Sequence, residues 1–193
     1  EKLKYTFVYA PQGNYEHSEL EEEYECNSFI QRLLDETKAI YPNKRCNTFV
    51  GTDSKDKRAT LLKAFGQGTI DVLFAMKCLD EGVDVPRAEC GIFTSSTGNP
   101  REFIQRRGRL LRNHAEKTFS YIYDMVVIPS TINREECNSS MERNQVKSEL
   151  KRVAYFASLA VNCYANNGAC EVLNGVAQHF GIVWSELFED VEQ

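Results

Sequence analysis

Short runs of apolar and β-branched residues alternate with helical segments up to about residue 128, and this alternation limits the choice of fold most strongly. The runs occupy residues 5–10, 46–50, 71–75, 90–95 and 119–127. Apolar residues at helical spacing predict three helices. The first covers residues 20–41, the second begins after a cap at Asp53 or Ser54 and ends at Gly66, and the third covers 101–112. Several runs are apolar at consecutive positions, so both faces of those strands must be buried. The pattern predicts an α/β fold with a mainly parallel sheet that helices cover on both sides.

The pattern changes after residue 130. A long helical stretch over 141–164, a break at 166–168 and a shorter helix over 172–180 replace the alternation, and Trp184 belongs to a last turn. A chain of 193 residues, 42% of them hydrophobic, can bury one good core and a smaller appendage. We therefore expect an α/β domain over residues 1–130 and a small α-helical extension over 131–193.

The charge of the chain is unevenly distributed. A net charge of -5 argues against a protein that coats nucleic acid or an anionic membrane through bulk charge. Residues 101–112, however, hold five arginines and a single acid, Glu102. Basic charge is thus concentrated in one segment, where it can act locally.

The seven cysteines are odd in number and show no Cys-x-x-Cys spacing, which favours reduced, buried thiols of an intracellular protein. Cys163, Cys170 and His179 lack a fourth ligand, so we expect no metal site there. No apolar run approaches the ~20 residues that cross a bilayer, and residues 1–4 do not resemble a signal peptide. We expect a soluble, cytoplasmic protein with no membrane partner. Because the chain opens at Glu1, shortly before a strand, we also expect a piece of a longer protein.

A basic motif fills residues 105–112, with the sequence Gln-Arg-Arg-Gly-Arg-Leu-Leu-Arg. Arg109 and Arg112 are three residues apart, so on a helix their guanidinium groups leave the same face and suit a phosphate chain. Gly108 would cost about 1 kcal/mol in a helix interior. That cost favours a close approach of backbone at this point over the alternative of a solvated basic helix face.

An acidic, glycine-containing loop over residues 80–86 follows the third apolar run. Gly82 leaves a backbone N–H open to an anion. In parallel α/β folds the ligand lies beyond the carboxyl ends of the strands, and both this loop and the basic motif follow strands there. The alternative is an ordinary loop, which explains Gly82 and Pro86 alone.

The two segments resemble motifs VI and V of the second RecA-like lobe of superfamily 2 helicases and translocases, over residues 5–128. The fixed positions of motif VI are matched by Gln105, Arg106, Gly108, Arg109 and Arg112. The resemblance implies a RecA-like three-layer domain with a mainly parallel sheet. One departure is Met76, since a small hydroxyl residue is usual there, and no hydrogen bond from such a hydroxyl is expected.

The resemblance also implies a role for each motif residue. Arg109 and Arg112 would be the catalytic arginine fingers that neutralise a γ-phosphate, an effect of about 10³ to 10⁵ in rate. The ATP site would comprise both arginines together with Gln105, Gly82 and Asp84.

Nucleic acid would bind at the strand-end loops. Residues 9–12 occupy the position of the family's motif IV, and 52–58 that of motif IVa. The turn over 95–100 is rich in hydroxyl groups that suit a sugar-phosphate backbone or, equally, a helix cap. The implied nucleic-acid contacts are Ala10, Pro11, Gln12, Arg58, Lys77, Ser96 and Thr97.

ATP hydrolysis also requires a glycine-rich phosphate loop ending in Gly-Lys-Ser or Gly-Lys-Thr, and acidic Mg²⁺ ligands. Neither is recognisable in the chain. We therefore expect ATP and Mg²⁺ to be held mainly by an amino-terminal RecA-like lobe of the same protein, and this chain alone to fold but to be inactive. Gln105 at the start of motif VI and the loop over 79–86 favour DNA over RNA, as in the restriction and repair branches of the superfamily.

Two other functions stay open. A non-catalytic RecA-like module would bind nucleic acid or protein without needing its arginines. A stand-alone small-phosphate-binding domain would bind nucleotide measurably by itself.

Overall fold

The computed structural model describes residues 3–11, 29–76, 87–94, 100–129 and 140–188. It divides into two compact units, unit 1 (Glu1–Met125) and unit 2 (Val126–Gln193). Each unit has a hydrophobic core of its own.

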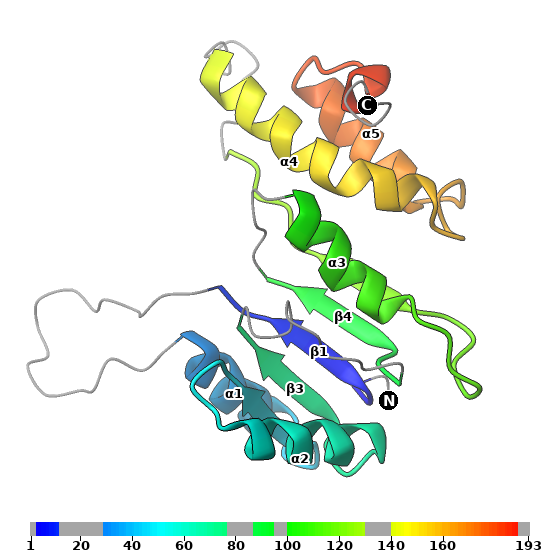
Figure 1. Cartoon of the computed structure of the whole chain (residues 1–193). Coiled ribbons are helices and arrows are strands. Elements are labelled where there is room, and N and C mark those ends of the chain that lie inside the picture. The colour runs from blue at the N-terminus through cyan, green and yellow to red at the C-terminus, as the bar shows by residue number, and fades with distance from the viewer. Residues whose placement is uncertain (1–2, 12–28, 77–86, 95–99, 130–139, 189–193) are drawn as a thin grey trace, which may run out of the picture. The chain divides into compact units, whose positions relative to one another are not determined.

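Unit 1 is built on a sheet that has five strands among the described residues, each parallel to its neighbours (Figure 1). In sheet order they are β2 (Cys46–Phe49), β3 (Val72–Ala75), β1 (Thr6–Tyr9), β4 (Cys90–Phe93) and β5 (Tyr121–Asp124). All residues of β1 and β3 are buried, which is why their sequences are apolar at consecutive positions. The predictions of a parallel sheet and of the positions of its strands are confirmed.

Helices cover both faces of this sheet. α1 (Phe29–Ile40) lies on one face, and α2 (Lys55–Gly66) and α3 (Pro100–Leu110) lie on the other. Ser54, one of the two expected caps, begins α2 by accepting a hydrogen bond from the Lys57 N–H. The predicted first helix is confirmed from Phe29 onward, whereas its residues 20–28 lie outside the described part of the chain.

The two faces have separate cores. Ile30 and Leu34 of α1 pack against the side chains that β1 and β3 direct to that face. Leu61 and Phe65 of α2 and Leu110 of α3 pack against the alternate positions of the same strands. α3 therefore sits on an apolar surface that the central strands provide.

Unit 2 is helical. α4 (Ser140–Ser158), α5 (Ala169–His179) and the 3₁₀ turn η1 (Trp184–Leu187) surround its core. The core comprises Val146, Leu150, Ala154, Ala177, Phe180, Ile182 and Leu187.

The prediction that the first helix of this unit continues to residue 164 is wrong. α4 ends at Ser158, and tight turns follow, in one of which the Gly168 N–H donates to Ala165 O (2.7 Å). A Cβ at Gly168 would overlap Asn162 O and Ala165 O, so this turn requires glycine.

Cys163 and Cys170 form a disulfide, so the prediction of reduced thiols is wrong for this pair. Both are buried, and they close the turn between α4 and α5 against Ala157. Cys46 and Cys90 are free, and burial raises the pKa of both thiols, as in unreactive core cysteines.

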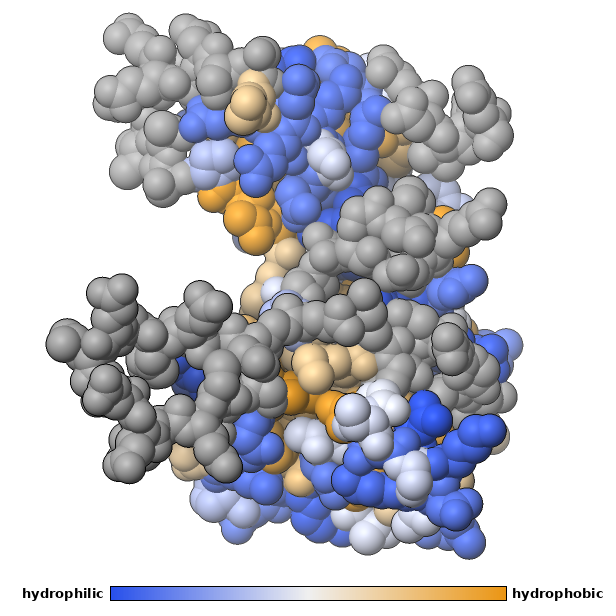
Figure 2. All heavy atoms as spheres, turned by 60° about the vertical axis from the view of Figure 1, so that its left-hand side comes forward, coloured by the Kyte–Doolittle hydropathy of each residue, from blue (hydrophilic) through white to orange (hydrophobic). Residues whose placement is uncertain are grey.

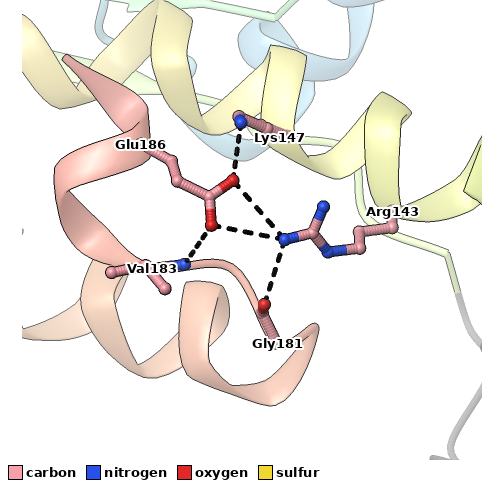
Figure 3. A network of polar contacts seen from close by, with 5 residues as sticks. All are labelled: Arg143, Lys147, Gly181, Val183 and Glu186. Atoms are coloured by element: carbon pink, nitrogen blue, oxygen red, sulfur yellow. Dashed lines mark hydrogen bonds and ion pairs between the residues drawn. The ribbon is translucent and has the colours of Figure 1, made fainter. Parts of the chain in front are cut away.

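Glu186 ties η1 to α4 (Figure 3). Its carboxylate accepts hydrogen bonds from Lys147 Nζ (2.6 Å), Arg143 Nη2 (3.3 Å) and the Val183 N–H (3.1 Å). The hydrogen bond from Lys147, followed by that from Val183, lowers the pKa of Glu186 from 4.5 to about 2. Arg143 also donates to Gly181 O (3.1 Å), so one network holds both ends of the segment between α5 and η1.

None of the described helices combines the length and the apolar character that crossing a bilayer requires. In the view of Figure 2, hydrophilic side chains cover most of the described surface of each unit, and apolar side chains show in smaller groups. The helices thus keep their polar flanks toward solvent.

Acid should destabilise unit 2 through Glu186. A carboxyl whose pKa is lowered by folding stabilises the fold above its unfolded pKa, and this contribution disappears as the pH falls from 4.5 toward about 2. Glu186→Gln should therefore lower the free energy of unfolding at neutral pH and flatten its decrease in acid. Urea titrations followed by the fluorescence of Trp184, the only tryptophan, measure this.

Glu36→Gln is the control, since Glu36 forms an exposed ion pair with Arg32 in unit 1. It should leave the Trp184 transition unchanged at every pH. An acid slope in Glu186→Gln equal to that of the wild type would assign the sensitivity to other groups.

Reduction should also destabilise unit 2. The disulfide closes a loop with a sequence separation of 7, and loop entropy then gives about 2 to 3 kcal/mol. Dithiothreitol should move the Trp184 urea midpoint to lower urea. A Cys163→Ser/Cys170→Ser double variant should show the lower midpoint with and without reductant. A wild-type midpoint that ignores reductant, while alkylation proves the thiols free, would contradict this role.

Candidate functional site

The direction of α3 follows from the strands that it connects. β4 and β5 are parallel, so α3 must run antiparallel to both of them. Its last carbonyl, Leu110 O, accepts hydrogen bonds from Lys117 Nζ (2.7 Å) and Ser120 Oγ (2.6 Å). Lys117 Nζ also donates to Ala88 O (3.1 Å), and burial lowers the pKa of this lysine. Since Ala88 and Ser120 precede β4 and β5, the last turn of α3 lies at the amino ends of these strands.

This direction decides where the motif VI arginines lie. α3 follows the carboxyl end of β4, as expected, but carries Arg109 and Arg112 back toward the amino ends of the strands. α3 also ends at Leu110, so the prediction of a helix up to residue 112 is wrong, and Arg112 follows the last turn.

The motif nevertheless divides into two flanks with helical periodicity. One flank is exposed or half-exposed and the other is buried, as positions about 100° apart on a helix require. The accessible flank holds Gln105, Gly108, Arg109 and Arg112. The buried flank holds Arg106, Arg107 and Leu110. The predicted phosphate-directed residues thus lie together on the flank that a ligand can reach.

Arg107 turns inward instead. Its side chain is 2% exposed and forms an ion pair with Asp124, the last residue of β5. The guanidinium also lies 4.3 Å from the ring centroid of Phe93, at the end of β4. Sequence reasoning missed this pair, although an acid at the end of an otherwise apolar run was its signal. Arg106 lies more loosely over the ring of Tyr9, at 6.0 Å.

A glycine in β4 lets α3 approach the sheet. A Cβ at Gly91 would overlap Leu110 Cδ1 and stand 3.2 Å from Phe93 Cε2. Gly108 differs, because a Cβ there would meet nothing within 4 Å. The packing of this chain therefore requires glycine at residue 91 but not at residue 108.

Two predicted nucleic-acid contacts lie at the end of β1. Ala10 is 7% exposed, packs in the core beside α1, and its N–H donates to Ala75 O (2.9 Å). The side chain of Ala10 thus has a core role, and the assignment of this residue to a nucleic-acid contact stays a prediction. Pro11 is half-buried at the same edge of the sheet.

Arg58 belongs to the start of α2, which follows the carboxyl end of β2, and it is half-buried. In the loop before it, Asp53 accepts hydrogen bonds from the Val50 N–H (3.1 Å) and from Lys57 Nζ. Burial raises the pKa of Asp53, but these hydrogen bonds outweigh it and hold the pKa below its ordinary value. The carboxylate of Asp53, close to Arg58 in the sequence, is thus kept ionised by its own hydrogen bonds.

The remaining predicted site residues lie outside the described part of the chain. They are Gln12, Lys77, Gly82, Asp84, Ser96 and Thr97. Within the described ranges, no group of three or more His, Cys, Asp or Glu side chains is placed to hold a metal ion.

Residues 18–114 match the family model described as "Helicase conserved C-terminal domain". The chain belongs to this helicase family. The resemblance to the second RecA-like lobe of superfamily 2 helicases is thereby confirmed.

Two curated relatives share part of the helicase domain. The DNA 3'-5' translocase XPB2 of Sulfurisphaera tokodaii is 45% identical over 58 residues, which are 30% of this chain and 13% of the translocase. The uncharacterized protein Rv2917 of Mycobacterium tuberculosis is 33% identical over 101 residues, which are 51% of this chain and 16% of that protein. The chain thus matches only a small part of the length of these relatives.

A solved structure shares the fold. The helicase Lhr of Mycobacterium smegmatis, bound to ssDNA and AMP-PNP, aligns with a TM-score of 0.50 at 14% identity, over 79% of this chain and 17% of the Lhr chain. At this identity the likeness establishes the RecA-like helicase fold alone.

The two glycines near α3 should respond to alanine with opposite signs. Gly108→Ala should stabilise unit 1 by about 0.5 to 1 kcal/mol, because it restricts the unfolded chain and meets no atom in the folded one. Gly91→Ala should destabilise unit 1 by about 1 to 3 kcal/mol, because Leu110 already occupies the space. Thermal unfolding followed by far-ultraviolet circular dichroism measures both. Destabilisation by Gly108→Ala would mean that the helix itself needs this glycine.

Proposed function

We propose that the chain is the second motor lobe of an ATP-dependent nucleic-acid helicase or translocase that works in the cytoplasm. An amino-terminal RecA-like lobe of the same protein would hold ATP and Mg²⁺, and this chain would supply Arg109 and Arg112. The observation that carries the proposal is that Gln105 and Arg112 are exposed and Arg109 is half-exposed, on and directly after a helix that is anchored on its opposite side.

The chemistry of this flank fits a triphosphate. Guanidinium groups donate several hydrogen bonds in a plane and match phosphate oxygens, and their charge offsets the negative charge that phosphoryl transfer spreads over the γ-phosphate. Mg²⁺ prefers carboxylate oxygens and water. We assign its ligands to the amino-terminal lobe together with the phosphate loop, because neither sequence motif is recognisable in this chain.

Nucleic acid would bind at a different surface of the lobe. Pro11 and Arg58 lie at the carboxyl ends of β1 and β2, whereas Arg109 in the last turn of α3 and Arg112 directly after it lie toward the amino ends of β4 and β5. Contacts to phosphates would give little sequence preference and a strong dependence on salt. DNA is favoured over RNA, because the relative with 45% identity over the shared segment is a DNA translocase.

Replacing the arginines tests the motor function. In the complete protein, Arg109→Ala and Arg112→Ala should each lower kcat for ATP hydrolysis by about 10³-fold or more, since the transition-state charge loses its partner. Binding of single-stranded DNA without ATP should change little. Steady-state ATPase assays with saturating DNA, and fluorescence anisotropy for DNA binding, measure these effects.

Arg32→Ala is the matched control, because Arg32 is an exposed arginine on α1, on the opposite face of the sheet. It should retain full turnover. Unchanged ATPase in both arginine variants would favour the non-catalytic binding module. Measurable nucleotide affinity of the 193-residue chain alone, by calorimetry, would favour a stand-alone phosphate-binding domain.

A further inference from the structure

We propose that Arg107 is a positioning residue for the arginine flank, and that it acts through its buried ion pair with Asp124. The proposal rests on the proposed function, because its effect is exerted on Arg109 and Arg112. Arg107 itself is enclosed at 2% exposure and cannot reach a ligand from that position.

The pair joins three elements at one point. Arg107 extends from α3, Asp124 ends β5, and the Phe93 ring under the guanidinium ends β4. Helical side chains lean toward the amino end of their helix, so the guanidinium reaches the carboxyl ends of the strands, opposite to the end at which Leu110 is held. α3 is therefore fixed at two separate places.

The second place differs in kind, because its side-chain contact is apolar. Leu110 packs onto Gly91, and its carbonyl is held by Lys117 and Ser120. Apolar packing has no preferred direction and permits a helix to roll. The contact of Arg107 Nη2 with the Asp124 carboxylate does have one, because the N–H groups of a guanidinium are fixed in a plane. The ion pair therefore helps to set the rotation of α3 about its axis, and it does so from the carboxyl ends of the strands, away from the hydrogen bonds that hold Leu110 O.

Rotation of α3 moves the accessible flank directly. Arg107 and Arg109 are two positions apart on one helix, so any roll that disturbs the first turns the second by the same angle. A roll of about 20° displaces a side chain at the ~6 Å radius of a helix by about 2 Å. A misplacement of about 1 Å can cost roughly 10²-fold in rate. Small rotations of α3 would thus measurably lower kcat for ATP hydrolysis.

A buried ion pair is also a poor choice for stability alone. Well-packed apolar residues of similar volume are commonly as stabilising as a buried pair or more so, because neither charge must leave water. Unit 1 nevertheless keeps a charge at 2% exposure beneath the one helix that carries the phosphate-directed arginines. A role in fixing the rotation of α3 explains why Arg107 is buried there, whereas a role in stability does not.

Asp124→Asn tests the proposal in the complete protein, since it keeps the shape of the side chain and removes its charge. We expect kcat for ATP hydrolysis to fall by about 10- to 10²-fold with KM for ATP within about threefold. In an Arg109→Ala background the same change should have almost no further effect, because residues that act as one unit are not additive. Independent effects of the two changes would overturn the proposal.

Asp71→Asn is the matched control. Asp71 is also a buried aspartate beside a strand, and it accepts hydrogen bonds from Arg45 Nε (3.0 Å) and Nη2 (3.1 Å), but at the amino end of β3. It should lower the thermal stability of the protein without changing kcat well below the melting temperature. Equal losses of kcat in Asp71→Asn and Asp124→Asn would show that general destabilisation causes both.

An apolar replacement separates seating from stability. Compared with Asp124→Asn, an Arg107→Met/Asp124→Leu double variant should regain much of the thermal stability but keep a low kcat. If the pair were purely structural, the double variant would regain both the thermal stability and kcat. Arg109→Ala and Arg112→Ala are measured alongside. If they retain turnover, the proposed function fails, and this inference fails with it. If they lose turnover while Asp124→Asn keeps it, the inference alone fails.

Discussion

The burial of β1 and β3 on both faces is the constraint on which the rest of unit 1 depends. Strands that lack a solvent face need helices on either side, and parallel neighbours need a crossover helix between them. The crossover from β4 to β5 is α3, so the direction of α3 is decided by the sheet and not by its own sequence. That direction moves the motif VI arginines away from the loops at the carboxyl ends of the strands. One lobe thereby presents two surfaces of different chemistry.

The underside of α3 combines two kinds of contact with different energetics. Leu110 and Gly91 meet in an apolar contact that is favourable in any rotation that keeps it covered. Arg107 and Asp124 form a contact that is favourable in few orientations, and it carries the cost of removing two charges from water. The first contact holds the helix on the sheet and the second selects one arrangement of it.

Sequence predicted the sheet better than it predicted the helix ends. The strands are recognisable because short runs of consecutive apolar residues indicate strands that are buried on both faces. The parallel arrangement follows from the helices between them. The predicted end of α4 was wrong because Ala160 and Tyr164 continue the helical spacing of Val153 and Ala157, although Tyr164 is 92% exposed. Spacing reports a pattern of residue types, whereas burial depends on what packs against them.

In the candidate site, too, some features were predictable from the sequence and others depended on the tertiary structure. The accessible flank was predictable, since positions three and four apart on a helix share a face whatever the tertiary structure. The inward turn of Arg107 was not, because its partner Asp124 lies 17 residues further along the chain and only the parallel register of β4 and β5 brings the two together. The burial of Ala10 was not predictable for a related reason, as the end of a strand can face the core or the edge, and the position of α1 decides which.

The ion pair also explains how an acidic chain can present a basic surface. The net charge is -5, and at physiological ionic strength charges further apart than about 8 Å are largely screened. An approaching polyanion therefore responds to the charges of the flank that it meets and not to the total. On that flank Arg112 is exposed and Arg109 is half-exposed, while the buried Arg107 is paired with Asp124. The buried arginine thus contributes to the geometry of the surface and the outer two to its potential, although all three belong to one motif.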